Sequence, residues 1–384
     1  MPTLITARRL LTDIGSVEFP VLIVDDDGII TDISSDPTAL ANEEDTLSAA
    51  FFDQHIHGGL GHDVMSATPP QLAEMQRFLA SRGVAQYLPT TVTAPVDSTL
   101  RALDALANAI EAEPQPLQAR PIGIHLEGPF LSHAKRGVHP EAQLQTPSIE
   151  LFERFRQAAR GHIRLMTIAP ELPGGTDLIA HATAHGVRCS LGHTNALAAE
   201  AIAGVEAGAT SATHTFNAMR ALDHREPGVL GVALDDARLY AELICDGVHV
   251  APEVVRLWLK AKGPERAILV TDAMSAAGMP DSDYKLGELD VRVANGRAFL
   301  SGDMTQGKET LAGSVLTMDR AVANVRSFTG CPLAVATRLA SHNPAAMIGR
   351  PELTRLAPGG PANLNRFDTR GHLIATYIQG EIVD

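Results

Sequence analysis

The chain has 384 residues, of which 45% are hydrophobic and 20% charged, and this composition excludes a disordered or collagen-like protein. Its 45 acidic residues against 31 Lys and Arg give a formal net charge of −14, opposite in sign to proteins that bind nucleic acid through its phosphates. No apolar run reaches the roughly 18 residues of a membrane-spanning helix, so we expect a cytoplasmic protein with neither a nucleic-acid nor a membrane partner.

The first 48 residues are predicted to form short β-strands. The runs 4–10 and 21–33 combine apolar and β-branched residues with an Asp/Gly turn, and 371–384 contains two similar runs around a glycine. Neither end of the chain is large enough to bury a sound core alone. We therefore predict one small β domain that residues 1–48 and 350–384 build together.

Residues 49–349 alternate between short apolar runs and segments with a helical pattern. Eight apolar runs occur, at 50–57, 84–93, 121–128, 162–171, 187–194, 210–219, 240–250 and 266–274. Helical patterns fill most gaps, as at 70–83, 97–113 and 196–208. The gap 220–239 has the weakest pattern because it contains Pro227 and several glycines.

Eight strand–helix units over about 250 residues match an α/β fold of the (β/α)8 TIM-like barrel type. A doubly wound parallel sheet is the competing fold. That fold usually has fewer strands, and no GxGxxG follows the first apolar run. We therefore predict that residues 49–349 form a barrel.

Polar residues of metal-ligand type end six of the eight apolar runs. They are His55 with His57, Glu127, His193, His214, His249 and Asp272. The C-terminal ends of barrel strands converge on one mouth, where barrel active sites lie. The strand count and the placement of these residues therefore predict the same site.

The motif His55-Ile56-His57 suits a metal site on a strand. Residues i and i+2 of a strand point to the same face, so both imidazoles can reach one ion. On a helix they would point about 200° apart. The alternative is a chance pair at a strand end, which the other candidates at the mouth make less attractive.

Glu127, His193 and His214 are the remaining candidate ligands. Taken singly, a Glu is more often a surface turn or salt-bridge residue, and a His a hydrogen-bonded structural residue. His125 shares the face of Glu127 and could be a neighbour, a ligand or a packing residue. The three cysteines lie far apart with no CxxC, so a closed thiolate site is not expected. Nitrogen and oxygen ligands suit zinc, iron, manganese or cobalt at a catalytic site.

Asp272 ends the eighth run and is the candidate general base. A carboxylate within an apolar run costs free energy unless it is paired or bound to a cation. Its alternative role is a helix N-cap. None of the five lysines ends a strand, so a carboxylated lysine bridge between two metals is not expected, and any bridging ligand would be Glu127.

Short motifs follow one another between residues 50 and 349: FDQHIHGG, HLEGPFLSHAKRGVHP, TIAPE, LGHT, THTFNAM, HREPG, CDGVHV, VTDAMSAAG, LAGSVLTMDRAV and NPA. Together they closely resemble the N-acetylglucosamine-6-phosphate deacetylases of the amidohydrolase superfamily. The resemblance implies a metal-dependent barrel with a small β-sandwich built from both termini, and a homodimer. It also implies hydrolysis of the N-acetyl group of N-acetylglucosamine 6-phosphate.

Carried over to this chain, the resemblance gives each motif residue a role. Glu127, His193 and His214 match the principal metal site, and Asp272 matches the catalytic base. His55 and His57 make the chain similar to members that can hold two ions. The expected cofactor is thus one or two divalent cations per subunit, zinc first, with iron, manganese or cobalt as alternatives.

The remaining matches concern the substrate. By this resemblance, His139 and His249 hold the substrate and polarise its carbonyl, Asn217 and Ala218 form a substrate-binding turn, and Leu311, Ala312 and Gly313 lie in a loop near the sugar. Arg225 matches a phosphate ligand that reaches across the dimer interface. Three alternatives remain open: N-acetylgalactosamine 6-phosphate as substrate, an N-acyl amino acid as substrate, or a barrel that binds sugar phosphate without catalysis.

Overall fold

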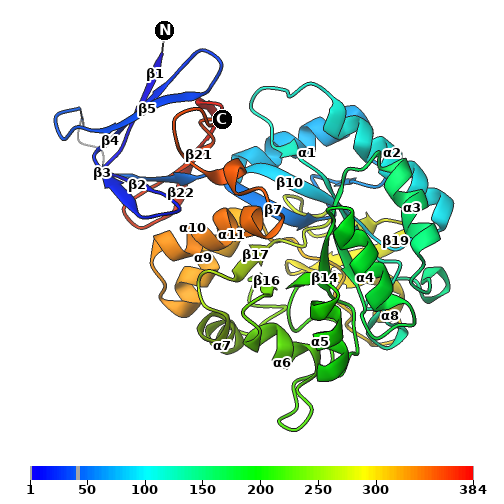
Figure 1. Ribbon diagram of the computed structural model, residues 1–384. Coiled ribbons are helices and arrows are strands. Elements are labelled where there is room, and N and C mark those ends of the chain that lie inside the picture. Colours follow the sequence, from blue (N-terminus) through cyan, green and yellow to red (C-terminus); the bar gives the residue numbers. More distant parts are fainter. Residues whose placement is uncertain (1, 40–43, 384) are drawn as a thin grey trace.

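A barrel of parallel strands forms the centre of the protein (Figure 1). The computed structural model describes residues 2–39 and 44–383. The eight barrel strands are β7 (Phe51–Ile56), β10 (Val84–Thr91), β12 (Ile124–Glu127), β13 (Ile163–Ile168), β14 (Arg188–Leu191), β15 (Ala209–Ala212), β16 (Tyr240–Ile244) and β17 (Ala267–Val270). Seven of them lie within one of the eight apolar runs, and β15 begins one residue before its run; the predicted fold class is confirmed.

Neighbouring barrel strands pair in parallel from β7 through β10 and β12 to β17. The short β11 (Arg120–Pro121) adds to the side of β10. The barrel closes beyond the end of β17, where the N–H of Asp272 donates to the carbonyl of His55 at 2.9 Å. Most barrel-strand residues are buried because helices cover the outer face, which explains the continuous apolar runs.

Helices follow the strands and, apart from the one-turn α8, form the outer ring (Figure 1). They are α1 (Pro69–Ser81), α2 (Val96–Glu111), α3 (Ile149–Ala158), α4 (Gly175–Ala184), α5 (Ala198–Glu206), α6 (Gly228–Asp235), α7 (Pro252–Lys262), α8 (Ser301–Met304), α9 (Met318–Thr329), α10 (Leu333–Ala340) and α11 (His342–Met347). Thr68 and Gln71 start α1 with a capping box. Within the part of the chain that the structure describes, no helix is long and apolar enough to cross a bilayer.

Both ends of the chain build the small β-sandwich at one side of the barrel (Figure 1). One sheet has the order β1-β4-β5, from β1 (Thr3–Thr6), β4 (Pro20–Val24) and β5 (Ile30–Ser35). The other has the order β23-β22-β21-β6-β2-β3, from β23 (Glu381–Val383), β22 (Leu373–Ile378), β21 (Leu364–Phe367), β6 (Thr46–Ala49), β2 (Arg9–Leu11) and β3 (Ser16–Glu18). Leu22, Leu47 and Leu364 share its core. The predicted boundaries at 48 and 350 stay a prediction, and their ranges include residues 1, 40–43 and 384, which lie outside the described residues.

An antiparallel sheet that the sequence reading had not foreseen follows the last barrel strand. It consists of β18 (Asp283–Leu286), β19 (Leu289–Ala294) and β20 (Arg297–Leu300). Its apolar face packs with Val138 and Met274. Because Leu286 also lines the cavity at the barrel mouth, this sheet forms part of the wall of the site.

Candidate metal centre and active site

A cavity of about 230 Å³ opens at the C-terminal ends of the barrel strands. Its lining includes most of the predicted site residues: His57, Glu127, His139, His193, His214, Asn217, Ala218, His249, Asp272, Leu311 and Gly313. Three residues that the resemblance selected lie elsewhere. His55 lies beside the lining and is fully buried, Ala312 is buried behind its loop, and Arg225 is exposed on the loop before α6.

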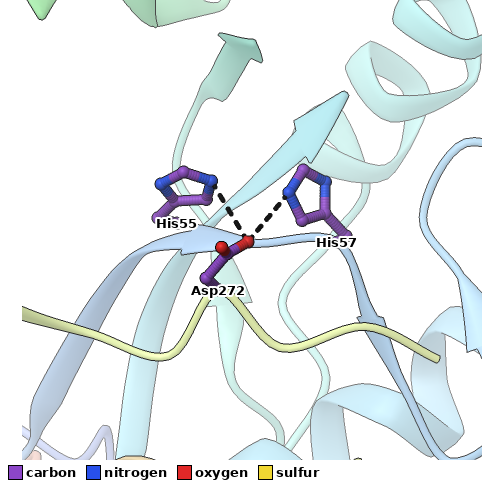
Figure 2. A group of neighbouring side chains, drawn as sticks. All are labelled: His55, His57 and Asp272. Carbon is purple, nitrogen blue, oxygen red and sulfur yellow. Dashed lines mark ion pairs between the residues drawn. The ribbon is translucent and has the colours of Figure 1, made fainter. Parts of the chain in front are cut away.

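His55 and His57 both face the carboxylate of Asp272 (Figure 2). The distances from Asp272 Oδ1 are 3.5 Å to His55 Nε2 and 3.1 Å to His57 Nε2. Glu127 faces the same two nitrogens, with Oε1 3.5 Å from His55 Nε2 and Oε2 3.3 Å from His57 Nε2. The imidazoles of His55, on β7, and His57, directly after it, therefore point at one small volume that both carboxylates also face.

Glu127 also faces the two histidines from β14 and β15. Its Oε1 lies 3.3 Å from His193 Nε2 and 3.2 Å from His214 Nε2, and those two nitrogens are 3.1 Å apart. Glu127 thus has one oxygen toward His193 and His214 and the other toward His57. This arrangement suits a carboxylate shared by two cations.

The backbone turns sharply where three of these residues leave their strands. His193, His214 and Asp272 each lie two residues beyond the strand end and have positive φ angles of 48°, 28° and 49°. Residues other than glycine rarely adopt this region, and such residues cluster at functional sites. The turn directs each side chain into the mouth.

Two histidines form hydrogen bonds through Nδ1, and this leaves their Nε2 atoms available to bind a cation. His57 Nδ1 donates to the carbonyl of Thr90 and His193 Nδ1 to the carbonyl of Lys135, both at 3.0 Å. A carbonyl only accepts, so the proton of each neutral ring lies on Nδ1 and the lone pair on Nε2. Metal-ligating histidines are commonly held in this way.

His139 carries its proton on the opposite nitrogen. The backbone N–H of Thr93 donates to His139 Nδ1 at 3.2 Å, so Nδ1 accepts and the neutral ring is protonated at Nε2. That Nε2 lies 3.6 Å from Glu127 Oε2 and lines the cavity. His139 therefore offers the cavity a hydrogen-bond donor rather than a metal ligand.

The buried histidines and carboxylates at the barrel mouth shift one another's pKa values. Burial by itself would lower the pKa of His57, but its bonds to Asp272 and Glu127 raise it to about 9. Burial would likewise raise the pKa of Glu127, yet the charge of His55 and the contacts with His139, His193 and His214 hold it well below its usual value. The carboxylates therefore draw positive charge into this buried site.

These residues fit a divalent cation. His55 Nε2 is buried without a hydrogen-bond partner, and the donor set consists of imidazole nitrogen and carboxylate oxygen. His55, His57 and Asp272 form one group whose ligand atoms lie within 4.8 Å of one another, and Glu127, His139 and His193 form another. In the second group, the tautomer of His139 favours His214 in its place.

Further polar residues support the cavity from behind. Asp246 Oδ2 accepts from His249 Nδ1 at 2.7 Å, and Asp246 Oδ1 accepts from the backbone N–H of His249 at 2.8 Å. Glu242 contacts His55 and Gln54 from within the barrel. The sequence reading missed both acids, although Glu242 lies in an apolar strand, where an unpaired charge would be costly.

Known proteins resemble this chain over its whole length. The Amidohydrolase family model matches residues 46–383. The chain is 36% identical over 386 residues to an N-acetylgalactosamine-6-phosphate deacetylase of Escherichia coli O157:H7, covering 100% of this chain and 99% of that protein. It is 37% identical over 313 residues to an N-acetylglucosamine-6-phosphate deacetylase of Bacillus subtilis, covering 80% of this chain and 77% of that protein.

The structure also superposes on solved relatives. A mutant N-acetyl-D-glucosamine-6-phosphate deacetylase from Mycobacterium smegmatis, in complex with N-acetyl-D-glucosamine-6-phosphate, gives a TM-score of 0.92 at 35% identity, covering 100% of this chain and 99% of that chain.

Proposed function

The chain belongs to the amidohydrolase family of enzymes, and we propose that it hydrolyses the N-acetyl group of N-acetylglucosamine 6-phosphate in amino-sugar catabolism and recycling. The products are acetate and glucosamine 6-phosphate. The observation that carries this proposal is the buried cluster of imidazoles and carboxylates at the barrel mouth, in a chain similar to such deacetylases over its whole length. With its described cysteines unpaired, the protein suits the cytoplasm as its place of action.

We assign the ligands of one cation to Glu127, His193 and His214, and those of a second, more weakly held cation to His55 and His57. Zinc is the proposed metal. A bound divalent cation lowers the pKa of water and polarises the amide carbonyl. The family relationship supports a metal, and the Nε2 atoms directed at Glu127 support these ligands.

Asp272 is the proposed general base and acid. Its carboxylate is placed at the cavity and is held ionised: burial by itself would raise its pKa, but His55 and His57 lower it below its usual value. It accepts the proton of the attacking water and returns that proton to the amide nitrogen as the C–N bond breaks. The product amine then leaves without negative charge on nitrogen.

His139 and His249 are the proposed substrate contacts. The Nε2–H of His139 points into the cavity and can donate to the carbonyl oxygen as negative charge develops there, a contribution of about 3–4 kcal/mol per donor in other enzymes. Asp246 holds His249 by Nδ1, which turns Nε2 toward the sugar. Asn217, Ala218 and the 311–313 loop are proposed to contact the sugar ring.

The substrate phosphate requires a cation from outside this cavity. None of the described residues that line it is Lys or Arg. We propose that Arg225 of a second subunit supplies the positive charge in a homodimer. Arg225 lies on the 220–227 loop, which projects beside α6 (Figure 1). Exposed apolar side chains lie on that loop and at α5: Leu222 on the loop, Ile202 on α5 and Leu197 directly before α5.

Acetate release from N-acetylglucosamine 6-phosphate tests the proposal. Activity should disappear with a chelator and return with added zinc, iron, manganese or cobalt. N-acetylgalactosamine 6-phosphate and an N-acetyl amino acid serve as comparison substrates. Binding of N-acetylglucosamine 6-phosphate to the metal-loaded protein without acetate release would refute the deacetylase and favour a non-catalytic barrel.

A further inference from the structure

We propose that Glu242 is a positioning residue of the metal centre: it holds His55 so that Nε2 faces the cavity, and it sets the affinity of the ion at His55 and His57. This inference rests on the metal ligands of the proposed function. It adds a residue that lies outside the cavity, on β16, which β17 separates from the strand leading into the His-x-His pair.

Glu242 lies in the middle of β16 and is fully buried. Its carboxylate accepts three hydrogen bonds. Gln54 Nε2 donates to Oε1 at 2.6 Å, while His55 Nδ1 at 3.3 Å and the backbone N–H of His214 at 3.1 Å donate to Oε2. One carboxylate therefore contacts an imidazole of the His55–His57 pair and the backbone of a residue from the other ligand set.

The contact with Glu242 distinguishes His55 from the other candidate ligands. His57 and His193 donate Nδ1–H to neutral carbonyls, whereas His55 donates to a carboxylate. A carboxylate behind a ligating imidazole fixes its tautomer and raises its basicity. For His55 this leaves Nε2, which is buried and has no hydrogen-bond partner, directed at Glu127 and Asp272.

The cost of burying Glu242 supports a role beyond packing. A charged carboxylate in a barrel interior is expensive unless it is paired. Among the residues that the structure describes, neither Lys nor Arg pairs with this carboxylate, and His55 is its one ionisable partner. A hydrophobic side chain would fill the same volume without this cost, so the carboxylate is best explained by what it does to His55.

The substitution Glu242→Gln separates the charge from the shape. The new amide oxygen can still accept from His55 Nδ1 and the His214 N–H. Gln54 Oε1 has no hydrogen-bond partner in the structure, so after a rotation of the Gln54 amide it can accept from the new NH2. The fold should therefore survive while the negative charge behind His55 is lost. Asp25→Asn is the control, because Asp25 Oδ1 accepts from the backbone N–H groups of Asp27 and Ile29, and an amide oxygen can do the same there, in the small β-sandwich away from the metal ligands.

The experiment measures zinc affinity by competition with a chromophoric chelator, on metal-free full-length protein, for wild type, Glu242→Gln, Asp25→Asn and His55→Ala. His55→Ala should remove one ion. We expect Glu242→Gln to lower the zinc affinity of that same site by about 10–100-fold. The affinity for the other ion, and both affinities in the Asp25→Asn control, should stay near wild type. When cobalt replaces zinc, the absorption spectrum of the ion at His55 and His57 should differ between Glu242→Gln and the wild type.

The outcomes distinguish this inference from the proposed function. If His55→Ala loses one ion but Glu242→Gln binds both as wild type does, the role of Glu242 is refuted and the metal ligands stand. If Glu242→Gln lowers only the melting temperature of the metal-free protein, Glu242 is structural and the inference fails. If His55→Ala keeps both ions, the metal assignment fails with it. Should Glu242→Gln not fold, Glu242→Asp takes its place, because it keeps the charge but withdraws it from His55. Wild-type zinc affinity of the His55 and His57 site in Glu242→Asp would equally overturn the inference.

Discussion

Replacing Asp272 by Asn tests the chemical step of the proposed mechanism. The substitution keeps the shape of the side chain, and the backbone contacts of residue 272 with His55 and Ser314 do not depend on the carboxylate. The amide oxygen can still face His57 Nε2, 3.1 Å away in the wild type. What the amide cannot do is accept the proton of a water molecule at neutral pH.

The expected loss follows from that single missing function. General acid–base catalysis contributes about 10²–10⁴-fold, which corresponds to roughly 3–5 kcal/mol of barrier at about 1.4 kcal/mol per decade. We therefore expect kcat for acetate release to fall at least about 100-fold, while the protein folds and keeps its more tightly held ion. Metal content must be measured on the same sample, because lost metal would also abolish activity.

Asp236→Asn is the matched control for this experiment. Asp236 follows α6 and pairs with Arg238, so the same chemical change occurs away from the cavity lining. The control should retain wild-type kcat. If the metal-loaded Asp272→Asn enzyme keeps more than about a tenth of kcat, a barrier change below roughly 1.4 kcal/mol, Asp272 is not the general base.

Three further predictions concern the metal, the second subunit and pH. The double substitution His55→Ala/His57→Ala should lose one of two ions in metal analysis; loss of both would place the pair in the principal site, and loss of neither would make it structural. Arg225→Ala and Asp272→Asn chains, each inactive alone, should regain activity on subunit exchange toward half of wild type per mixed dimer if Arg225 acts in trans; unchanged activity would mean that it acts in cis or not at all. Burial, with help from the charge of Arg338, lowers the pKa of His342 to about 4. Between pH 6.5 and 4 the unfolded chain therefore binds a proton that the folded protein does not, so stability falls as pH falls through this window. Unfolding free energies of His342→Gln should show a weaker fall over that range, and parallel curves for both proteins would contradict the assignment.

Much of the barrel was predictable because local signals and the final fold agree. Each apolar run became a barrel strand, since strands covered by helices need apolar residues on both faces. The helices expected at 70–83, 97–113 and 196–208 appear as α1, α2 and α5. The candidate ligands lie together for the same reason, because the C-terminal ends of parallel strands converge.

The sheet β18–β20 was missed although its signal is short-range. Residues 289–294 alternate between buried and exposed positions, and Asn295 and Gly296, with φ of 53° and 69°, form the turn to β20. An Asn-Gly pair between alternating runs is a strong hairpin signal. Eight strands had already accounted for the barrel, so this region had no place in the expected fold.

The contacts of Glu242 with His55 and of Thr93 with His139 could not have been predicted in the same way. His55 and Glu242 are 187 residues apart, and Thr93 and His139 are 46 apart. Which nitrogen of each ring carries the proton depends on the partner that the folded barrel brings to it. Spacing along the sequence selects candidate ligands but does not determine their tautomers.

The junction between the small sheet and the barrel has a consequence for how the protein is made. Only Ala50 separates β6 from β7, so the strand that carries His55 continues directly from the sandwich. β6 pairs with β21, where Leu364 lies opposite Ala49. On the ribosome, β6 must wait for more than 300 further residues before this partner exists. Until then one edge of β6 is open to pairing with other chains. Nascent chains that stop before Leu364 should therefore aggregate even when all eight barrel strands have been synthesised.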